Sequence, residues 1–96
     1  MGDVLYAVSR ATGVPVAEIR KPGRGPDRVA AARHLSFYLV REMTGESWPS
    51  IGRFFGRHHP SVINGYRNIA RTMKERKGYA AMVENIRWNL KNEHAS

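Results

Sequence analysis

Residues 56–65 read GRHHPSVING and place an arginine, two adjacent histidines and a serine around a proline. Histidine is the commonest metal ligand and a frequent general base. Arginine, serine and asparagine are side chains that hydrogen-bond to base edges in DNA. Three kinds of chemistry are therefore open to this segment: metal binding, acid–base catalysis and DNA recognition.

The rest of the sequence argues against the first two. A structural zinc site needs four suitably spaced ligands, but the chain has no cysteine, and His34 and His94 are its only other histidines. No G-x-S-x-G motif and no Walker A loop occurs. Ser61 lies two residues after His59, but this spacing does not indicate a catalytic nucleophile activated by a histidine base. We expect no metal, no cofactor, no small-molecule substrate and no catalytic residue, and hence no enzyme.

Positive charge is concentrated in the middle of the chain. The 96 residues carry a formal net charge of +8, and residues 20–77 contain 13 Lys or Arg against 4 Asp or Glu. Such a distribution is typical of a surface that binds a polyanion. The alternatives are a basic domain that is merely soluble and an acidic membrane surface, and the latter is disfavoured because the basic residues are spread over several elements.

No targeting or membrane segment is expected. The opening MGDVLYAVS lacks a cationic start followed by a long apolar run, as a signal peptide would have. No stretch of about 18 apolar residues occurs, so no membrane span is predicted. We expect a cytoplasmic protein without a membrane partner, associated with the nucleoid.

The spacing of apolar residues predicts one compact all-α domain, residues 1–96, with five to six helices and no strands. The predicted helices cover residues 4–12, 15–20, 28–44, 48–55, 60–77 and 79–92. Capping preferences suggest Asp3, Asp27 and Ser47 as N-caps, prolines 15 and 49 in first turns, and glycines 13, 45 and 56 as stops. The stretch KPGRGP (21–26) is predicted to be an exposed basic loop.

Each predicted helix has an apolar face, and these faces should form the core. The expected core residues are Val4, Leu5, Val8, Val29, Ala32, Leu35, Phe37, Tyr38, Leu39, Val40, Met43, Ile51, Phe54, Phe55, Val62, Tyr66, Ile69, Ala70, Met73, Met82, Val83, Ile86 and Leu90. Trp88 is expected to cap this core; the alternative is that Trp88 and Tyr79 furnish a contact surface.

Residues 47–77 have the pattern of a helix-turn-helix: a short helix, a turn containing Gly56 and a second helix. This motif places the start of its second helix in the major groove of DNA. The expected base-contacting residues are therefore Arg57, His58, His59, Pro60, Ser61 and Asn64. A solvated helix face beside a turn is the alternative.

The run SWPSIGRFFGRHHPSVINGYRNI (47–69) resembles the signature of the C-terminal DNA-binding domain of the bacterial DnaA family, roughly S-x-x-x-I-G-x-x-F-G-R-D-H-[ST]-T-V. Residues 28–45 resemble the family's A-R-Q-x-A-x-Y-L-x-R-E-x-T helix, and residues 14–20 resemble the segment before its basic loop. The resemblance covers about residues 3–90.

The resemblance implies a role for individual positions. His59 and Ser61 match base-contacting residues, and Arg24 of the basic loop matches an arginine that enters the minor groove. The residues expected at the DNA backbone or minor groove are Arg24, Arg28, Arg33, Arg41, Ser47, Trp48 and Pro49.

Three positions depart from the family pattern. His58 replaces an aspartate that accepts from a base, Pro60 replaces a hydroxyl residue, and Gly65 replaces an alanine, which should leave room for close approach to DNA. Because histidine can donate where aspartate accepts, we expect an altered base preference.

The predicted function is sequence-preferring binding of double-stranded DNA, without an ATPase, to regulate replication initiation or transcription in a bacterium or phage. The alternative is an adaptor that docks on replication proteins and binds DNA only weakly and non-specifically.

Overall fold

The third helix runs through the middle of the molecule and packs against most of the others. The computed structural model describes residues 1–95, with side chains as far as Glu93. Helix α3 (Asp27–Thr44) contacts α1 (Gly2–Thr12), α2 (Val16–Arg20), α4 (Trp48–Phe55) and α5 (His59–Glu75), whereas α6 (Lys77–Ala95) packs against α1 and α5. Every regular element of the described residues is a helix, which confirms the predicted all-α fold.

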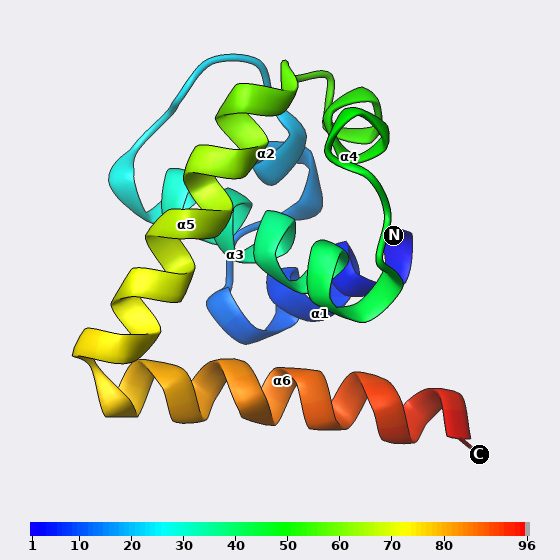
Figure 1. Ribbon diagram of the computed structural model, residues 1–96, viewed down its shortest axis with the longest axis vertical. Coiled ribbons are helices and arrows are strands. Elements are labelled where there is room, and N and C mark those ends of the chain that lie inside the picture. The colour runs from blue at the N-terminus through cyan, green and yellow to red at the C-terminus, as the bar shows by residue number, and fades with distance from the viewer. Residues whose placement is uncertain (96) are drawn as a thin grey trace.

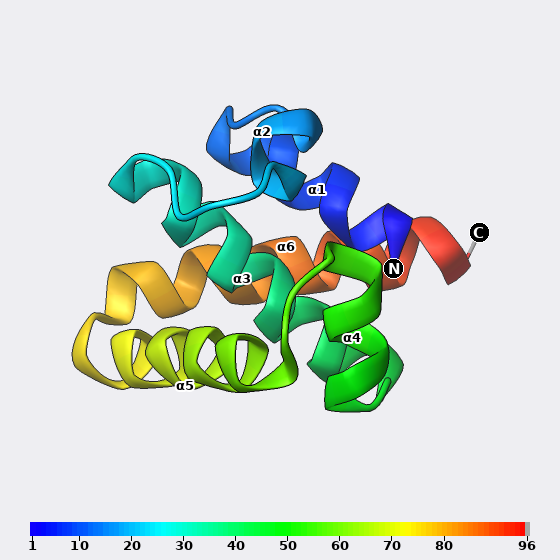
Figure 2. The same ribbon diagram turned by 90° about the horizontal axis from the view of Figure 1, so that it is seen from above.

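The helices leave two distinct ends to the molecule. Helix α6 lies along one side, and the loop before α3 and the connection between α4 and α5 lie at the opposite side (Figure 1). Seen from above, α3 lies between α2 and α5 (Figure 2). The helix-turn-helix formed by α4 and α5 is thus mounted on α3 and is remote from most of α6.

Several predicted helix ends are confirmed. The hydroxyl of Ser47 accepts from the amide of Ser50 at 3.2 Å and caps α4. Gly13, Gly45 and Gly56 follow α1, α3 and α4 in the left-handed conformation. Because only glycine adopts this conformation at little cost, the sequence marked these three ends correctly.

Other predicted ends are wrong by one to three residues. The N-caps of α1 and α3 are Met1 and Pro26, so Asp3 and Asp27 lie inside the first turn, where a carboxylate still interacts favourably with the helix dipole. Pro15 is the N-cap of α2 rather than part of its first turn.

The break between the last two helices was also misplaced. Helix α5 starts at His59 and ends at Glu75. Arg76 is extended, and Lys77 and Gly78 begin α6 instead of ending α5. No glycine or proline occupies the break itself, so local residue preferences gave no signal there.

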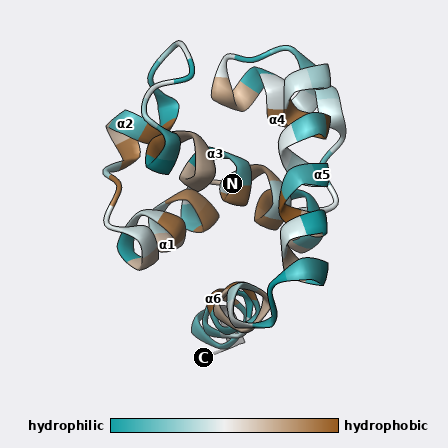
Figure 3. Ribbon diagram, turned by 90° about the vertical axis from the view of Figure 1, so that its left-hand side faces the viewer, coloured by the Kyte–Doolittle hydropathy of each residue, from teal (hydrophilic) through white to brown (hydrophobic). Residues whose placement is uncertain are grey.

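The predicted apolar faces form the core. Among the residues expected there, Val8, Leu39, Val40, Ile51, Val62 and Val83 are completely buried, and Met43, Phe54, Tyr66, Ala70, Met73 and Met82 pack against the core while remaining partly exposed. Figure 3 shows apolar residues of α1 and α3 gathered toward the middle, while much of α5 is hydrophilic.

Trp88 does not cap the core, and that prediction was wrong. Its side chain is 63% exposed. Val83, Ile86 and Leu90 point inward, and at about 100° per residue Trp88 lies on the opposite side of the helix. Tyr79, its proposed companion, is half-buried against the core.

A polar cluster joins three helices beside the apolar core. The hydroxyl of Tyr66 donates to Glu42 at 2.7 Å, and Arg87 lies 3.4 Å from the same carboxylate. The hydrogen bond to Glu42, together with burial, raises the pKa of Tyr66 to about 12. This cluster links α5 and α6 to α3.

The helix-turn-helix depends on a close backbone approach at Gly52. The amide of Arg57 donates to the carbonyl of Gly52 at 2.8 Å. A Cβ atom at position 52 would lie 2.5 Å from the carbonyl oxygen of Arg57, which is too close without a shift of the turn. The turn therefore requires glycine at position 52.

We expect Gly52→Ala to destabilise the protein by up to about 2 kcal/mol. Alanine improves helix propensity by about 1 kcal/mol, but overpacking against a fixed backbone costs about 1–3 kcal/mol, and the second effect should win. Urea unfolding measures the difference. Gly78→Ala is the matched control, because a Cβ there meets nothing within 4 Å, and it should be neutral or stabilising. Equal effects of the two substitutions would contradict the steric explanation.

His34 gives a second prediction. Burial lowers the pKa of His34, and the charges of Arg33, Arg24 and Arg57 lower it further. The unfolded chain therefore binds a proton at His34 at higher pH than the native chain does. Stability should be full above the ordinary pKa of about 6.5 and should fall as the pH drops through it toward the lower native value.

Urea unfolding of the native protein and of His34→Gln at pH 7.5, 6.5 and 5.5 measures this effect. The loss of stability toward pH 5.5 should be smaller in His34→Gln, since carboxylates titrate mainly below about pH 5. The same pH dependence in both proteins would show that His34 is not its source.

Candidate nucleic-acid interface

The start of α5 is exposed and carries most of the side chains predicted to read bases. His58, His59, Pro60, Ser61 and Asn64 are all exposed. His58 is extended and makes no side-chain cap hydrogen bond, and Pro60 lies in the first turn of the helix. A helix N-terminus without a side-chain cap attracts anions. The structure therefore brings these five residues together on an accessible surface.

The turn that positions this surface is built from local interactions. Gly56 ends α4 with φ 67°, and the amide of Arg57 donates to the carbonyl of Gly52. The ring of Phe55 meets Phe37 of α3 edge-on, with ring centroids 4.9 Å apart. Since Phe37 and Phe55 are buried, the turn has a fixed position relative to α3.

The loop of residues 21–25 lies against this turn. Nη2 of Arg57 donates to the carbonyls of Lys21 at 2.6 Å and Gly23 at 2.8 Å. Arg24 is exposed and forms an ion pair of 2.8 Å with Asp27. The predicted basic loop and the predicted base-reading helix are therefore neighbours, although they are more than 30 residues apart in the sequence.

Arg33 has a different place from the one predicted. It is only 3% exposed. Its Nε donates to Ile19 at 2.7 Å, its Nη1 to Arg24 at 2.9 Å, and its Nη2 to the carbonyls of Glu18 and Lys21. The side chain is therefore unavailable to a phosphate, and it positions the basic loop instead.

The electrostatics around Arg33 agree with this placement. Burial lowers the pKa of Arg33, and the nearby charges of Arg57 and Arg24 lower it further. Arg33 lies four residues after Val29 and four before Phe37, both buried. Its position on the inward stripe was the sequence signal that could have identified it as buried.

Gly65 was expected to leave room for DNA, and this was wrong. It is buried at the contact between α5 and α3, where a Cβ would lie 2.7 Å from Phe37 and 2.8 Å from His34. Asn68 also turns toward α3, with its amide nitrogen 3.4 Å from Nδ1 of His34, and it accepts a hydrogen bond from Arg71.

A second set of predicted residues gathers where α3 leads into α4. Arg41 donates to the carbonyl of Glu46 at 2.7 Å, and its guanidinium lies 4.2 Å from the centroid of the Trp48 ring. Ser47 and Pro49 are exposed beside them. These residues present one cation, one hydroxyl and the N-terminus of α4.

Arg28 is exposed in the first turn of α3. It borders a shallow apolar groove of about 220 Å³ with Thr12, Tyr79 and Met82. Sequence reasoning also missed Arg20, which donates to the carbonyl of Phe54 at 2.7 Å and lies 4.6 Å from the centroid of its ring. Arg20 thereby ties α2 to α4.

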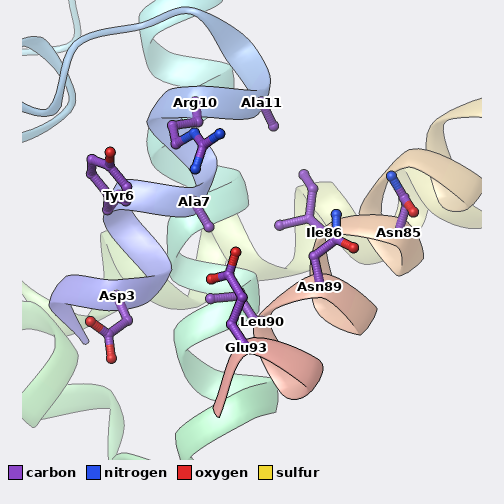
Figure 4. A pocket seen from close by; sticks show the side chains of 10 residues that line it. All are labelled: Asp3, Tyr6, Ala7, Arg10, Ala11, Asn85, Ile86, Asn89, Leu90 and Glu93. Carbon is purple, nitrogen blue, oxygen red and sulfur yellow. The ribbon is translucent and has the colours of Figure 1, made fainter. Parts of the chain in front are cut away.

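A larger groove of about 330 Å³ lies between α1 and α6 (Figure 4). Tyr6 and Arg10 border it on α1, and Asn85 and Asn89 border it on α6. None of the residues predicted to contact DNA lines this groove.

No set of three His, Asp or Glu residues that could hold a metal ion occurs among the described residues. None of the described helices is long and apolar enough to cross a membrane.

Comparisons with known proteins agree with the helix-turn-helix geometry. The family model described as the bacterial dnaA protein helix-turn-helix matches residues 1–69. The chromosomal replication initiator protein DnaA of Deinococcus deserti is 34% identical over 91 residues, which is 95% of this chain and 20% of the relative. DnaA of Deinococcus radiodurans is 37% identical over 87 residues, which is 91% of this chain and 18% of the relative.

DnaA from a bacterium of another genus gives the same result. DnaA of Streptococcus mutans is 33% identical over 90 residues, covering 93% of this chain and 20% of the relative. The chain therefore spans about a fifth of the length of these curated relatives. The resemblance expected from residues 47–69 is confirmed, and the chain belongs to the bacterial DnaA helix-turn-helix family.

Proposed function

We propose that these 96 residues bind double-stranded DNA with a preference for particular sequences, through the start of α5 in the major groove. The observation that carries this function is that His58, His59, Pro60, Ser61 and Asn64 are exposed at the start of α5, beside a basic loop. Helix-turn-helix proteins read base edges with this part of their second helix.

His59, Ser61 and Asn64 are the proposed base readers. All three are exposed, and none of their side chains makes a hydrogen bond that would have to be broken on binding. His58 takes the place of the family pattern's aspartate, so the preferred sequence should differ at the base that it faces. Pro60 contributes shape and apolar contact, because its side chain cannot donate.

Arg24 is proposed to enter the minor groove, and Arg41, Ser47, Trp48 and Pro49 to contact the backbone. The ion pair of Arg24 with Asp27 is no obstacle, because both side chains are largely exposed and such pairs contribute little. Half or more of protein–DNA hydrogen bonds go to the phosphates and sugars, which fix the register for base reading.

The proposed biological role is regulation of replication initiation or transcription in bacteria or phages. These residues would act in the cytoplasm, at the nucleoid, by binding rather than by catalysis. The matched helix-turn-helix and the relatives' function as chromosomal replication initiators support this role.

A second candidate is an adaptor that docks on replication proteins and binds DNA weakly. Its support is the exposed Trp88 on α6 and the groove beside the exposed Tyr6. An adaptor would bind selected and random duplexes alike, so the comparison of duplexes described below separates the two functions.

Replacing His59 tests base reading. Duplexes are first selected from a random pool by the native protein, and affinity is then measured for the selected and a scrambled duplex. His59→Ala should lose about 1–3 kcal/mol on the selected duplex and little on the scrambled one. Failure of the native protein to enrich any sequence would contradict the proposed function. Unfolding of His59→Ala in a thermal melt would show that the residue is structural.

Neutralising Arg41 tests the backbone contacts. With five or six phosphates contacted, log affinity should fall against log salt with a slope of roughly −5, and Arg41→Gln should reduce its magnitude by about one. Glutamine is shorter than arginine and loses the contact with the Trp48 ring, so a thermal melt of Arg41→Gln accompanies the binding measurement.

Lys91→Gln is the matched control, since it removes the same charge from the exposed surface of α6. The salt dependence of affinity for a random duplex is measured for all three proteins. An equal reduction of slope in both variants would indicate a general charge effect and would remove Arg41 from the interface.

A further inference from the structure

The loop of residues 21–25 has little structure of its own to hold it in place. Its residues are all exposed, Pro22 has no amide hydrogen, and Gly23 and Gly25 have φ values of 84° and 74°. Such a loop is flexible unless other groups fix it. The contacts that fix this loop therefore determine whether Arg24 has a single, defined position.

Guanidinium groups from two other elements bind the carbonyls of this loop. Arg33 of α3 donates to the carbonyls of Lys21 and Arg24. Arg57 of the helix-turn-helix turn donates from one nitrogen to both Lys21 and Gly23. Arg33 therefore anchors the loop to the core, and Arg57 anchors it to the turn that carries the base-reading helix.

From these contacts we infer that Arg57 is a positioning residue that holds the minor-groove loop in register with the major-groove helix. This inference rests on the proposed function and refines the earlier expectation that Arg57 contacts bases. Arg57 acts on DNA through Arg24: the hydrogen bonds to Lys21 and Gly23 occupy its Nη2, and they hold the two DNA-contacting elements at a fixed separation.

The arrangement brings three arginine charges near one another, and their repulsion would be destabilising if backbone carbonyls did not accept hydrogen bonds from them. Burial lowers the pKa of Arg33, and the nearby charges of Arg57 and Arg24 lower it further. Carbonyl oxygens of the loop and of α2 offset this repulsion on Arg33 and Arg57. The side chain of Arg24 is 67% exposed, so it can interact with the negative potential of DNA.

A double-mutant cycle on DNA binding tests the inference. Arg24→Ala and Arg57→Ala should each weaken binding to the selected duplex on the order of tenfold, and the double variant should be little weaker than either single one. Losses that multiply in the double variant would show that Arg57 contacts DNA by itself and would overturn the inference.

Arg53→Ala is the matched control. Arg53 is an exposed arginine of the neighbouring helix α4, and its effect should multiply with that of Arg24→Ala because it does not touch the loop. Coupling of the same size for Arg53 and Arg57 would also overturn the inference, because it would reflect net charge alone.

A measurement without DNA separates this inference from the proposed function. NMR order parameters of the Gly23 and Gly25 amides should be near about 0.85 in the native protein and in Arg53→Ala, and below about 0.6 in Arg57→Ala. Gly45 serves as an internal reference for a fold that stays intact. Unchanged order at Gly23 and Gly25 in Arg57→Ala refutes the positioning role, whether or not the protein binds DNA. If no duplex is bound but the loop loosens, the proposed function fails and the positioning role stands.

Discussion

The buried guanidinium of Arg33 joins α3 to the end of α2 and to the loop that follows α2. A charge removed from water is destabilising unless hydrogen bonds replace its hydration, and Arg33 finds four carbonyl oxygens in Glu18, Ile19, Lys21 and Arg24. Those carbonyls belong to the end of α2, which Ile19 and Arg20 also hold in place, and to the loop, which Arg57 also binds. One side chain on α3 thus holds the carbonyls of four residues between Glu18 and Arg24, and removing it would leave these acceptors unsatisfied.

The helix-turn-helix is fixed to the same helix by close packing rather than by charge. Gly65 lets α5 approach Phe37 and His34 of α3, and Gly52 lets the turn fold back on α4. Phe37 and Phe55 fill the space between the three helices. Because interiors are densely packed, the angle at which α5 presents its N-terminus is determined by these contacts. The exposed start of α5 is polar, and the contacts beneath it are closely packed.

These two constraints meet at Arg57. It belongs to the turn through its backbone and to the basic loop through its side chain. The molecule consequently has one end where three segments distant in sequence present cations and hydrogen-bonding groups. Along its other side α6 contributes to the core and, through Arg87, to the cluster around Glu42. The exposed Trp88 lies on this helix, away from the turn, so a contact made there would leave the start of α5 free.

Much of this organisation could be predicted from the sequence because it is local. Apolar spacing identified the core faces of all the long helices, and glycines 13, 45 and 56 marked three helix ends. The motif around residues 47–69 identified the family, and the side chains of His58 to Ser61 are exposed as a helix start requires. Trp88 was misjudged although its angle on α6 was available, because it is adjacent in sequence to core residues but opposite to them on the helix.

What only the tertiary structure decided concerns contacts between distant segments. An arginine on a helix can snorkel to solvent or bury its head group, and the choice for Arg33 depended on carbonyls 9 to 15 residues away. A glycine on a helix can face DNA or a neighbouring helix, and for Gly65 the packing angle of α5 on α3 decided. The side chain of Arg57 could point to DNA or back to the loop, and the nearby carbonyls of Lys21 and Gly23 decided that. The sequence determined which residues are cationic, apolar or helical; the packing of α2, α4 and α5 on α3 determined which cations hold the fold and which remain exposed.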